Sequence, residues 1–501
     1  MTNLIEKKIL FLLFCKFSIL LFLIWIYVTN TFLYYDDFFI LEPVIHKLKT
    51  GSFPFLRYPE FSYLFYEKLI RVVNFFSISN DYYFIARAIN SLLLPLNSIL
   101  FFIVTKDFLK RNWALYGALI FGLSPAIFFS SASVKTESIL LTQLFVSFLF
   151  AQKWEKDINK IIWPCLSGVI AALAFGTKYN PSVPSIFLIF ILYAASKKEI
   201  KIKSLLRPFA IYSISAILTL ILLFPSLFNF AQFLNTPEIK NDIIFSPYPN
   251  AFMALTEWNA FPAGRFSYAF FHSLPLNVGP IIFISFILGH LFKLIPKTVL
   301  ITWGGFAFIN FIAASLLSLY RLPYYYTLCV PYLIISHIYL LMMIFKKFPK
   351  LEVLKVGVVL VSIFYQFYNF RWYSDVFYEY AYVIQKTVPR LKLKYLGTDE
   401  GSKDFFNWEL NLLNSSIKGD QVDTYVSQNQ PKYIFTSAQM IENYCMYKKS
   451  KVYSRHCEYF SKLLRGENGY HLLWKKDIPL PFYNPLYQEK NFSFYLLEKE
   501  S

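Results

Sequence analysis

Long apolar runs alternate with short polar stretches through the first 372 residues of the chain. A run of about 18 or more apolar residues is long enough to cross a bilayer as a helix, and on this basis we expect about 11 spans, some shorter than ideal. They lie near 9–30, 86–105, 112–131, 138–151, 161–177, 182–196, 208–229, 276–292, 298–319, 323–345 and 354–372. No small-residue cleavage site follows the first run, so we read it as a retained signal anchor.

Two long polar loops interrupt this pattern, at 31–85 and 230–275. Within the first loop, segments 38–48 and 61–76 carry apolar residues at helical spacing. This amphipathic pattern predicts two helices that lie in the membrane interface.

After residue 372 the pattern changes to that of a small folded domain. The segments KLKYLGTDE, QPKYIFTS and NFSFYLLEK predict strands, and 401–416 and 437–465 predict helices. The fold class we expect is therefore an α-helical polytopic membrane protein over 1–372, followed by a small C-terminal α/β domain over 373–501.

Composition agrees with a membrane protein, because hydrophobic residues make up 56% of the chain and charged residues 16%. The net charge is +18. The basic residues fall into short clusters, which are Lys7 and Lys8, then 106–111, 153–160, 197–207, 293–297 and 346–355. Every second loop is thus basic, and the positive-inside rule assigns these loops and the N-terminus to the cytoplasm. No basic face or known module indicates nucleic-acid binding.

Both long loops and the C-terminal domain then face the extracytoplasmic side. Several charged residues lie at the outer ends of the spans, and two more candidates lie in the first outer loop. They are Asp36, Asp37, Glu137, Lys178 and Arg321, with Arg57 and Tyr58 in the loop. Ionisable groups at such places are costly, which makes them candidates for one functional cavity at the outer leaflet.

Carboxylates beside cations near lipid suit one kind of chemistry. A carboxylate can take a proton from an attacking hydroxyl group. Lys and Arg can hold a phosphate, and Arg does so with two parallel hydrogen bonds. The set therefore favours sugar transfer from a lipid-linked phosphate, with the phosphate as leaving group.

Each residue also has a structural alternative. The two aspartates could cap the helix that follows them, and Glu137 could pair with Lys135 or cap its own helix. Lys178 and Arg321 could extend to lipid headgroups. A divalent metal ion held by Asp36, Asp37 or Glu137 stays open, since hard cations accept carboxylate oxygens.

Ordered motifs along the chain resemble the GT-C superfamily of membrane glycosyltransferases. The similarity is closest to the branch of protein O-mannosyltransferases and aminoarabinose transferases, which use polyprenyl-phosphate sugars. The motifs are YYDD after the first span, RYPE at 57–60, SSASVKTE at 130–137, GTKYNPS at 176–182, SLPLNVGP at 273–280 and YRLPYYY at 320–326.

The resemblance implies a lipid-linked phosphosugar as donor and one aspartate of the pair as the catalytic base, and Asp36 matches that place best. From their position we expect Asp37 and Glu137 to orient the acceptor or a metal ion. The resemblance also implies that Lys178 and Arg321 lie near the donor phosphate. No histidine or extra carboxylate matches the metal-binding positions of some relatives. The acceptor stays open among glycan, lipid and protein, and the sugar among hexoses and pentoses.

Two other functions remain as alternatives. A polymerase or ligase for lipid-linked oligosaccharides would also need outer-face cations. A transporter or flippase would perform no chemistry, but it commonly shows internal repeats, which this chain lacks. The absence of long loops of the eukaryotic kind favours a bacterial inner membrane, with the site on the extracytoplasmic side.

Overall fold

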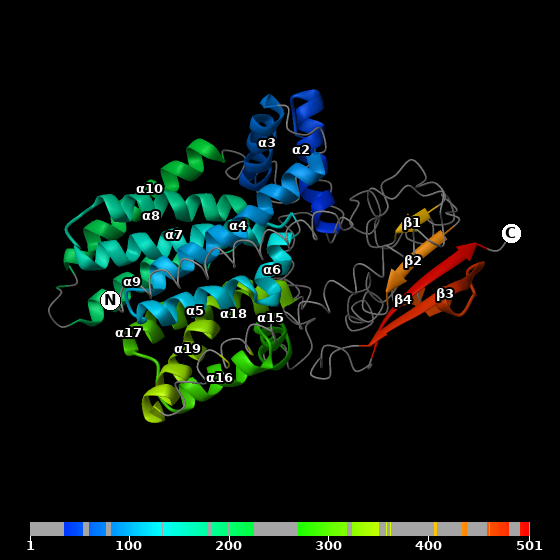
Figure 1. The fold of residues 1–501 in the computed structure, drawn as a ribbon. Helices are drawn as coiled ribbons and strands as arrows, with labels where there is room; N and C mark the ends of the chain where they lie inside the picture. The colour runs from blue at the N-terminus through cyan, green and yellow to red at the C-terminus, as the bar shows by residue number, and fades with distance from the viewer. Residues whose placement is uncertain are drawn as a thin grey trace.

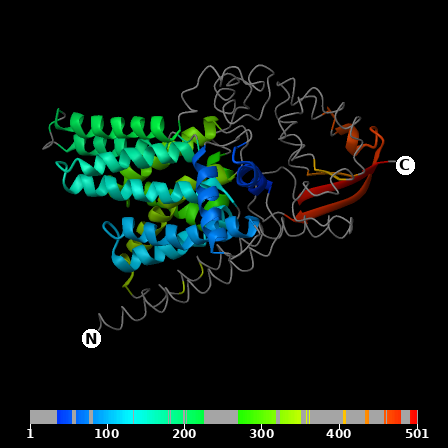
Figure 2. The ribbon, with the colours of Figure 1, turned by 90° about the horizontal axis from the view of Figure 1, so that it is seen from above.

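The computed structural model describes residues 35–53, 60–76, 82–132, 134–178, 180, 182–197, 201, 203–224, 269–317, 323–349, 357, 361, 405–407, 433–437, 458–459, 461–479 and 491–499. These residues form a helical part and a small sheet, which stand apart in both views (Figures 1 and 2). The first expected span and nearly all of the last one lie outside the described residues.

The first half of the described chain forms nine helices. They are α2 (Tyr35–Thr50), α3 (Glu60–Phe75), α4 (Tyr82–Thr105), α5 (Arg111–Gly122), α6 (Pro125–Ala132), α7 (Thr136–Lys156), α8 (Ile162–Thr177), α9 (Ser185–Ser196) and α10 (Lys203–Leu223). Helices α2 and α3 match the two amphipathic segments predicted in the first loop. Helix α7 extends beyond the predicted 138–151 at both ends.

The second half is less regular. It contains the π-helix η3 (Ala269–Ser273), α15 (Leu274–Val278), α16 (Pro280–Leu291), α17 (Lys297–Val299), the π-helix η4 (Leu300–Gly304), α18 (Gly305–Leu317), the 3₁₀ helix η5 (Pro323–Cys329) and α19 (Val330–Lys347).

Among the described residues, four helical stretches are long and apolar enough to cross a membrane. They are Phe84–Thr105, Lys203–Leu223, Lys297–Ser315 and Tyr326–Lys347. Three shorter apolar helices accompany them, at Ile162–Thr177, Ser185–Ser196 and Pro280–Leu291.

Two of the predicted continuous spans are wrong, because each is divided. The span at 112–131 breaks between α5 and α6, where Pro125 begins the second helix. The span at 276–292 breaks at Gly279, whose φ is +81°, directly before Pro280. Proline lacks a backbone N–H and disfavours helical geometry at the preceding residue, so a new helix begins there in both cases.

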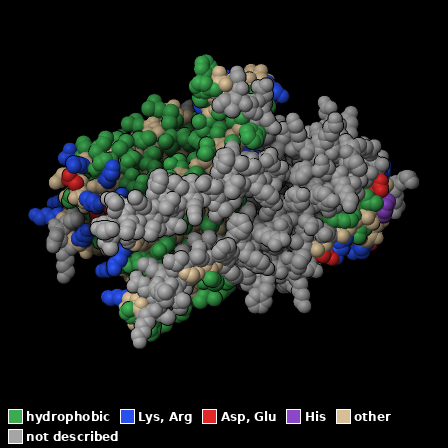
Figure 3. Space-filling model, viewed as in Figure 1, with side chains coloured by type: hydrophobic (Ala, Val, Ile, Leu, Met, Phe, Trp, Pro, Cys, Tyr) green, Lys and Arg blue, Asp and Glu red, His purple; other side chains and the backbone are tan. Residues whose placement is uncertain are grey.

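The basic clusters gather at one end of the helical part. Lys153 and Lys156 lie in the last turn of α7, whereas Glu137 lies in its first turn. Figure 3 shows lysine and arginine side chains together at the left-hand end of the molecule. The described basic residues of these loops therefore share one end of the helical part.

Two apolar cores hold the helices together. The larger one is rich in stacked rings, such as Phe148 on Trp303 with 3.8 Å between ring centroids. The smaller one joins α2, α3 and α4 to the turn before α7 through Ile40, Leu41 and Val134. This second core positions the candidate site.

Helices α8 and α10 approach unusually closely at Gly168. A Cβ atom added at Gly168 would overlap the hydroxyl of Ser215 and the carbonyl oxygen of Tyr212, and would lie 3.1 Å from the amide nitrogen of Ala216. Small residues let membrane helices pack backbone to backbone in this way.

We expect Gly168→Ala to lower the free energy of unfolding by about 1–3 kcal/mol, the usual effect of forcing an extra methyl group into a packed contact. Unfolding of the purified protein in mixed micelles measures it. Gly305→Ala is the control, since the added Cβ there would make only ordinary contacts at 3.7 Å or more. Equal stability of the two variants would contradict the expectation.

The described strands of the C-terminal region form one four-stranded sheet. The strands are β1 (Phe405–Asn407), β2 (Tyr433–Ser437), β3 (Tyr470–Pro479) and β4 (Asn491–Lys499), in the order β1-β2-β4-β3. Strands β1 and β2 are parallel, and the other pairs are antiparallel. Strands β2 and β4 confirm two predicted strands, while KLKYLGTDE lies outside the described residues.

Two predictions for this region are wrong where the structure describes it. Residues 405–407, expected in a helix over 401–416, form β1, because pairing with β2 outweighs local preference. Strand β3 was not predicted, since its Lys475, Lys476 and Asp477 and a register shift at Leu472–Trp474 obscure the alternation. Of the helix expected over 437–465, the described residues are helical at 458–459 and 461–464, and Ser437 ends β2.

Candidate active site

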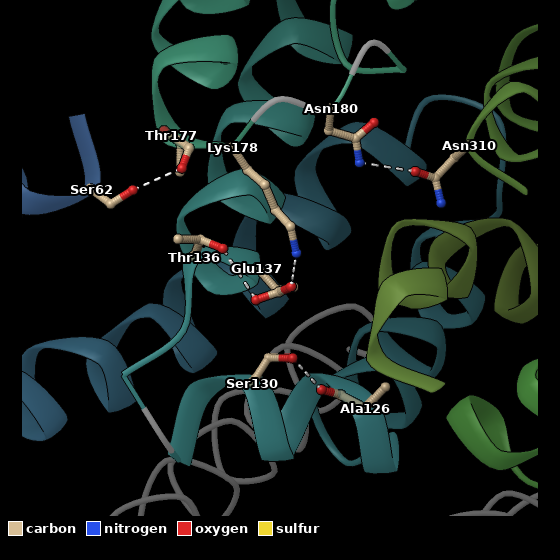
Figure 4. Close-up of polar contacts among 9 residues, drawn as sticks. All are labelled: Ser62, Ala126, Ser130, Thr136, Glu137, Thr177, Lys178, Asn180 and Asn310. Atoms are coloured by element: carbon tan, nitrogen blue, oxygen red, sulfur yellow. Dashed lines mark hydrogen bonds and ion pairs between the residues drawn. The ribbon is translucent and has the colours of Figure 1, made fainter. Parts of the chain in front are cut away.

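A buried ion pair lies at the end of the helices opposite the basic clusters. Glu137 lies in the first turn of α7, and Lys178 directly follows α8. Their carboxylate and ammonium groups are in direct contact (Figure 4). The Glu137 side chain is 7% exposed and that of Lys178 is 22% exposed. Glu137 thus pairs with a lysine from the neighbouring helix, and Lys178 turns inward.

Hydrogen bonds fix the backbone on both sides of this pair. The hydroxyl of Ser62 in α3 donates to the carbonyl oxygen of Thr177 at 2.7 Å. The amide of Gln143 in α7 donates to the hydroxyl of Thr177 at 2.9 Å. The Thr136 hydroxyl donates to Glu137 at 3.3 Å. The end of α8 is therefore held by α3 and α7 directly beside Lys178 (Figure 4).

Helix α4 holds the serine-rich turn that leads to Glu137. Asn90 donates to the carbonyl oxygen of Ser130 at 2.7 Å, and Asn97 donates to that of Ser138 at 2.9 Å. The hydroxyl of Ser138 also donates to the Ser130 carbonyl at 2.7 Å. Sequence analysis missed the two asparagines, although polar residues seven apart in an apolar span share one helix face and mark a contact.

Asp36 and Asp37 lie in the first turn of α2, of which the structure describes the backbone at these positions. Farther along this helix, Ile40, Leu41 and Val44 are buried in the same core as Val134. The helix that carries the acid pair therefore packs near the turn that carries Glu137. A place in the first turn also agrees with the capping alternative, because negative charge is favourable at a helix N-terminus.

The remaining candidates cannot be placed. Arg57, Tyr58 and Arg321 lie outside the described residues. Among the side chains that the structure does describe, no group of three or more His, Cys, Asp and Glu could hold a metal ion. Those of Asp36 and Asp37 are not among them, so a metal site there stays a hypothesis.

One buried acid escaped sequence analysis. Glu67 in α3 has a side chain that is 1% exposed, and it pairs with Arg71 one turn later and with Lys68 at 3.6 Å. Burial raises the pKa of Glu67, but the hydrogen bond from Arg71 and the charges of Lys68, Arg71 and Lys47 outweigh it and leave the pKa below 4.5. An i, i+4 Glu–Arg pair was the available signal.

This lowered pKa predicts a pH-dependent contribution to stability. The contribution is present at neutral pH and is lost as the pH falls through the lowered pKa, because the native state must then accept a proton. We expect Glu67→Gln to be less stable than the unchanged protein at pH 7, and the gap to shrink below pH 4.5. Thermal unfolding across pH tests this, and Arg71→Gln should show the same trend. A gap independent of pH would contradict it.

Comparison with known proteins places the fold. No protein-family model matches the chain, and no curated protein sequence matches it. Among solved structures, the chain is similar to the archaeal oligosaccharyltransferase AglB from Archaeoglobus fulgidus in complex with an inhibitory peptide and a dolichol-phosphate. The identity is 12%, the match covers 93% of this chain and 80% of that one, and the TM-score is 0.50.

Two further structures are similar. The Archaeoglobus fulgidus oligosaccharyltransferase tethered with an acceptor peptide containing the NVT sequon matches at 12% identity and a TM-score of 0.50, over 88% of this chain and 71% of that one. ArnT from Cupriavidus metallidurans bound to undecaprenyl phosphate matches at 15% identity and a TM-score of 0.47. The match covers 65% of this chain and spans 59% of the length of ArnT. At such identities the likeness is one of fold: the chain shares the fold of the AglB oligosaccharyltransferase structures, in agreement with the resemblance of its ordered motifs.

Proposed function

We propose that the protein is an integral-membrane glycosyltransferase that moves a sugar from a polyprenyl-phosphate donor to an extracytoplasmic acceptor. The observation that carries this proposal is the buried Glu137–Lys178 pair, at the helix ends opposite the basic clusters and near the helix of Asp36 and Asp37. The fold supports it, and the dolichol-phosphate in the AglB structure supports the donor class.

The proposed reaction is a direct displacement. Asp36 takes the proton of an acceptor hydroxyl while the acceptor oxygen bonds to the anomeric carbon of the sugar. The bond between that carbon and the phosphate oxygen breaks, its electron pair stays on the phosphate, and the configuration inverts. Asp37 orients the acceptor.

Cations then stabilise the charge that the leaving phosphate gains. We assign this role to Lys178 and Arg321, and place Arg57 and Tyr58 beside them from the first outer loop. Glu137 holds Lys178 in a defined position, since a charged hydrogen bond fixes the ammonium group. The acceptor, whether glycan, lipid or protein, enters from the extracytoplasmic side of a bacterial inner membrane, where we also place the C-terminal domain.

A divalent metal ion fits only part of this site. Glu137 is already neutralised by Lys178, and a second cation beside that ammonium group would be repelled. Asp36 and Asp37 are the remaining carboxylates that could bind one through their oxygens. The reaction proposed above routes no step through a metal.

A second candidate function has specific support. AglB is an oligosaccharyltransferase, which favours the alternative of a ligase or polymerase that accepts a lipid-linked oligosaccharide. Such an enzyme would take a longer sugar chain, linked to the lipid through a diphosphate.

A donor assay separates these functions. The purified protein in nanodiscs is given a labelled monosaccharide on polyprenyl phosphate or a labelled oligosaccharide on polyprenyl diphosphate, with membrane-extract acceptors. We expect label to leave the monosaccharide lipid. Transfer only from the diphosphate lipid would favour the ligase. In a parallel assay the protein is placed in proteoliposomes. Label that crosses their bilayer while still on its lipid would favour a flippase and overturn the proposal.

A further inference from the structure

The loop that carries Lys178 is tied to a distant helix by one buried asparagine. Asn310 lies in α18, and its side chain is fully buried. Its amide oxygen accepts hydrogen bonds from Asn180 at 3.2 Å and from the Ser182 hydroxyl at 3.0 Å. Figure 4 shows the Asn180–Asn310 contact together with the Lys178 side chain.

The asparagine is itself held in orientation. Its amide nitrogen donates to the Cys329 sulfur at 3.3 Å, at the end of η5. The Cys329 thiol in turn donates to the carbonyl oxygen of Ala307 at 3.4 Å, one turn before Asn310. Because both ends of the Asn310 amide are engaged, the oxygen that receives the Lys178 loop has a fixed direction.

The loop between Lys178 and this anchor is short and internally bonded. The backbone N–H of Asn180 donates to the backbone carbonyl oxygen of Lys178 at 2.6 Å. The side-chain oxygen of Asn180 accepts from the backbone N–H of Ser182 at 3.0 Å. It also lies 2.6 Å from the Ser182 hydroxyl, whose single proton is shared between Asn180 and Asn310. A displacement of Ser182 would therefore move Asn180 and, through it, Lys178, which lies two residues before Asn180.

An asparagine inside a membrane helix needs a reason, because a buried amide without partners is unfavourable. Simple fastening of helices is one reason. The contacts of Asn310 favour a more specific one, since both groups that donate to its oxygen belong to the loop that begins at Lys178.

We infer that Asn310 is a positioning residue, which fixes the Lys178 ammonium group where the donor phosphate binds. The inference rests on the proposed function. It assigns a role in donor affinity to a residue in the middle of α18, outside the motifs that the sequence singled out.

The test compares donor kinetics of four single variants and one double variant in nanodiscs. Asn310→Leu removes the anchor, and Asn180→Ala removes the half-buried side chain of the loop that donates to it. Thr302→Val is the matched control, because Thr302 lies in the same continuous helical stretch and its hydroxyl bonds only the Thr298 carbonyl in that stretch, at 2.8 Å. Lys178→Gln removes the positioned group.

We expect the KM for the donor to rise about threefold to tenfold in the first two variants, as for one lost buried hydrogen bond, with kcat changed less than about twofold. Thr302→Val should leave KM unchanged. The double variant Asn310→Leu/Lys178→Gln should be no worse than Lys178→Gln, because residues that act through one group are not additive.

Additive effects of the two changes, or an unchanged KM in Asn180→Ala, would overturn the inference. If Lys178→Gln itself leaves the donor KM unchanged, the proposed donor site fails rather than this inference alone. A fall in kcat and stability without a change in KM would assign Asn310 to helix packing only.

Discussion

Replacing Asp36 with asparagine is expected to lower the rate of sugar transfer at least about 100-fold, the usual contribution of a general base. The variant keeps the size and shape of the side chain but cannot take a proton from the acceptor. The measurement is the initial rate of transfer from a labelled polyprenyl-phosphate sugar, at saturating donor, by protein reconstituted in nanodiscs.

The same substitution separates catalysis from capping. Asparagine removes the negative charge from the first turn of α2, which is worth about 0.3–1 kcal/mol at a helix N-terminus, so the helix should lose little stability. Asp37→Asn is the matched control, because it makes the same change in the same helical turn. We expect a smaller loss of rate there. Near-normal turnover by folded Asp36→Asn protein would remove Asp36 from the mechanism.

Replacing Lys178 with methionine is expected to have the second large effect, on both stability and activity. It leaves the Glu137 carboxylate, 7% exposed, without its partner. Removing one member of a buried ion pair costs about 3–5 kcal/mol, because the other charge stays buried without compensation. The donor phosphate also loses the cation that we assign to it.

A second substitution distinguishes these two losses. The double variant Lys178→Met/Glu137→Gln removes both charges of the pair, so neither is left without its partner, and we expect most of the stability to return while transfer stays low. Denaturant unfolding and the donor assay measure the two quantities in one preparation. Recovery of transfer together with stability would mean that the pair is structural and that Lys178 does not bind the donor.

The Lys197–Glu155 pair provides the control. Its two groups are 2.6 Å apart, but the side chains are 41% and 23% exposed, and they lie at the basic end. Exposed ion pairs contribute about 0–1 kcal/mol. Lys197→Met should therefore change stability little and leave transfer unaffected.

Much of the helical part could be predicted because its signals are local. Apolar runs of sufficient length predicted α4, α10 and α19, and amphipathic spacing predicted α2 and α3. The breaks at Pro125 and Gly279 could have been read from the same chain, since proline and glycine interrupt helices for reasons within a few residues. Strand β1 could not, because its pairing with β2 is a tertiary contact.

The candidate site shows a similar division. The charge pattern singled out Glu137 and Lys178 and placed them at the same end, but the contact between them depends on how α7 and α8 pack. Asn310 could not be predicted as a site residue, because the sequence around a single asparagine in an apolar run does not indicate which residues it bonds. Its hydrogen bonds join residues about 130 positions apart in the chain, and only the fold brings them together.

The close approach of α8 and α10 makes the two sides of α10 unequal in their tolerance of substitution. On the side toward α8, the carbonyl oxygen of Tyr212 and the hydroxyl of Ser215 leave no space for one further carbon atom at Gly168. On the opposite face, Ile217 and Ile221 are 52% and 47% exposed. Any apolar residue of helical preference can serve there in a bilayer, so saturation mutagenesis should find a freely variable stripe running along α10 beside an almost invariant one.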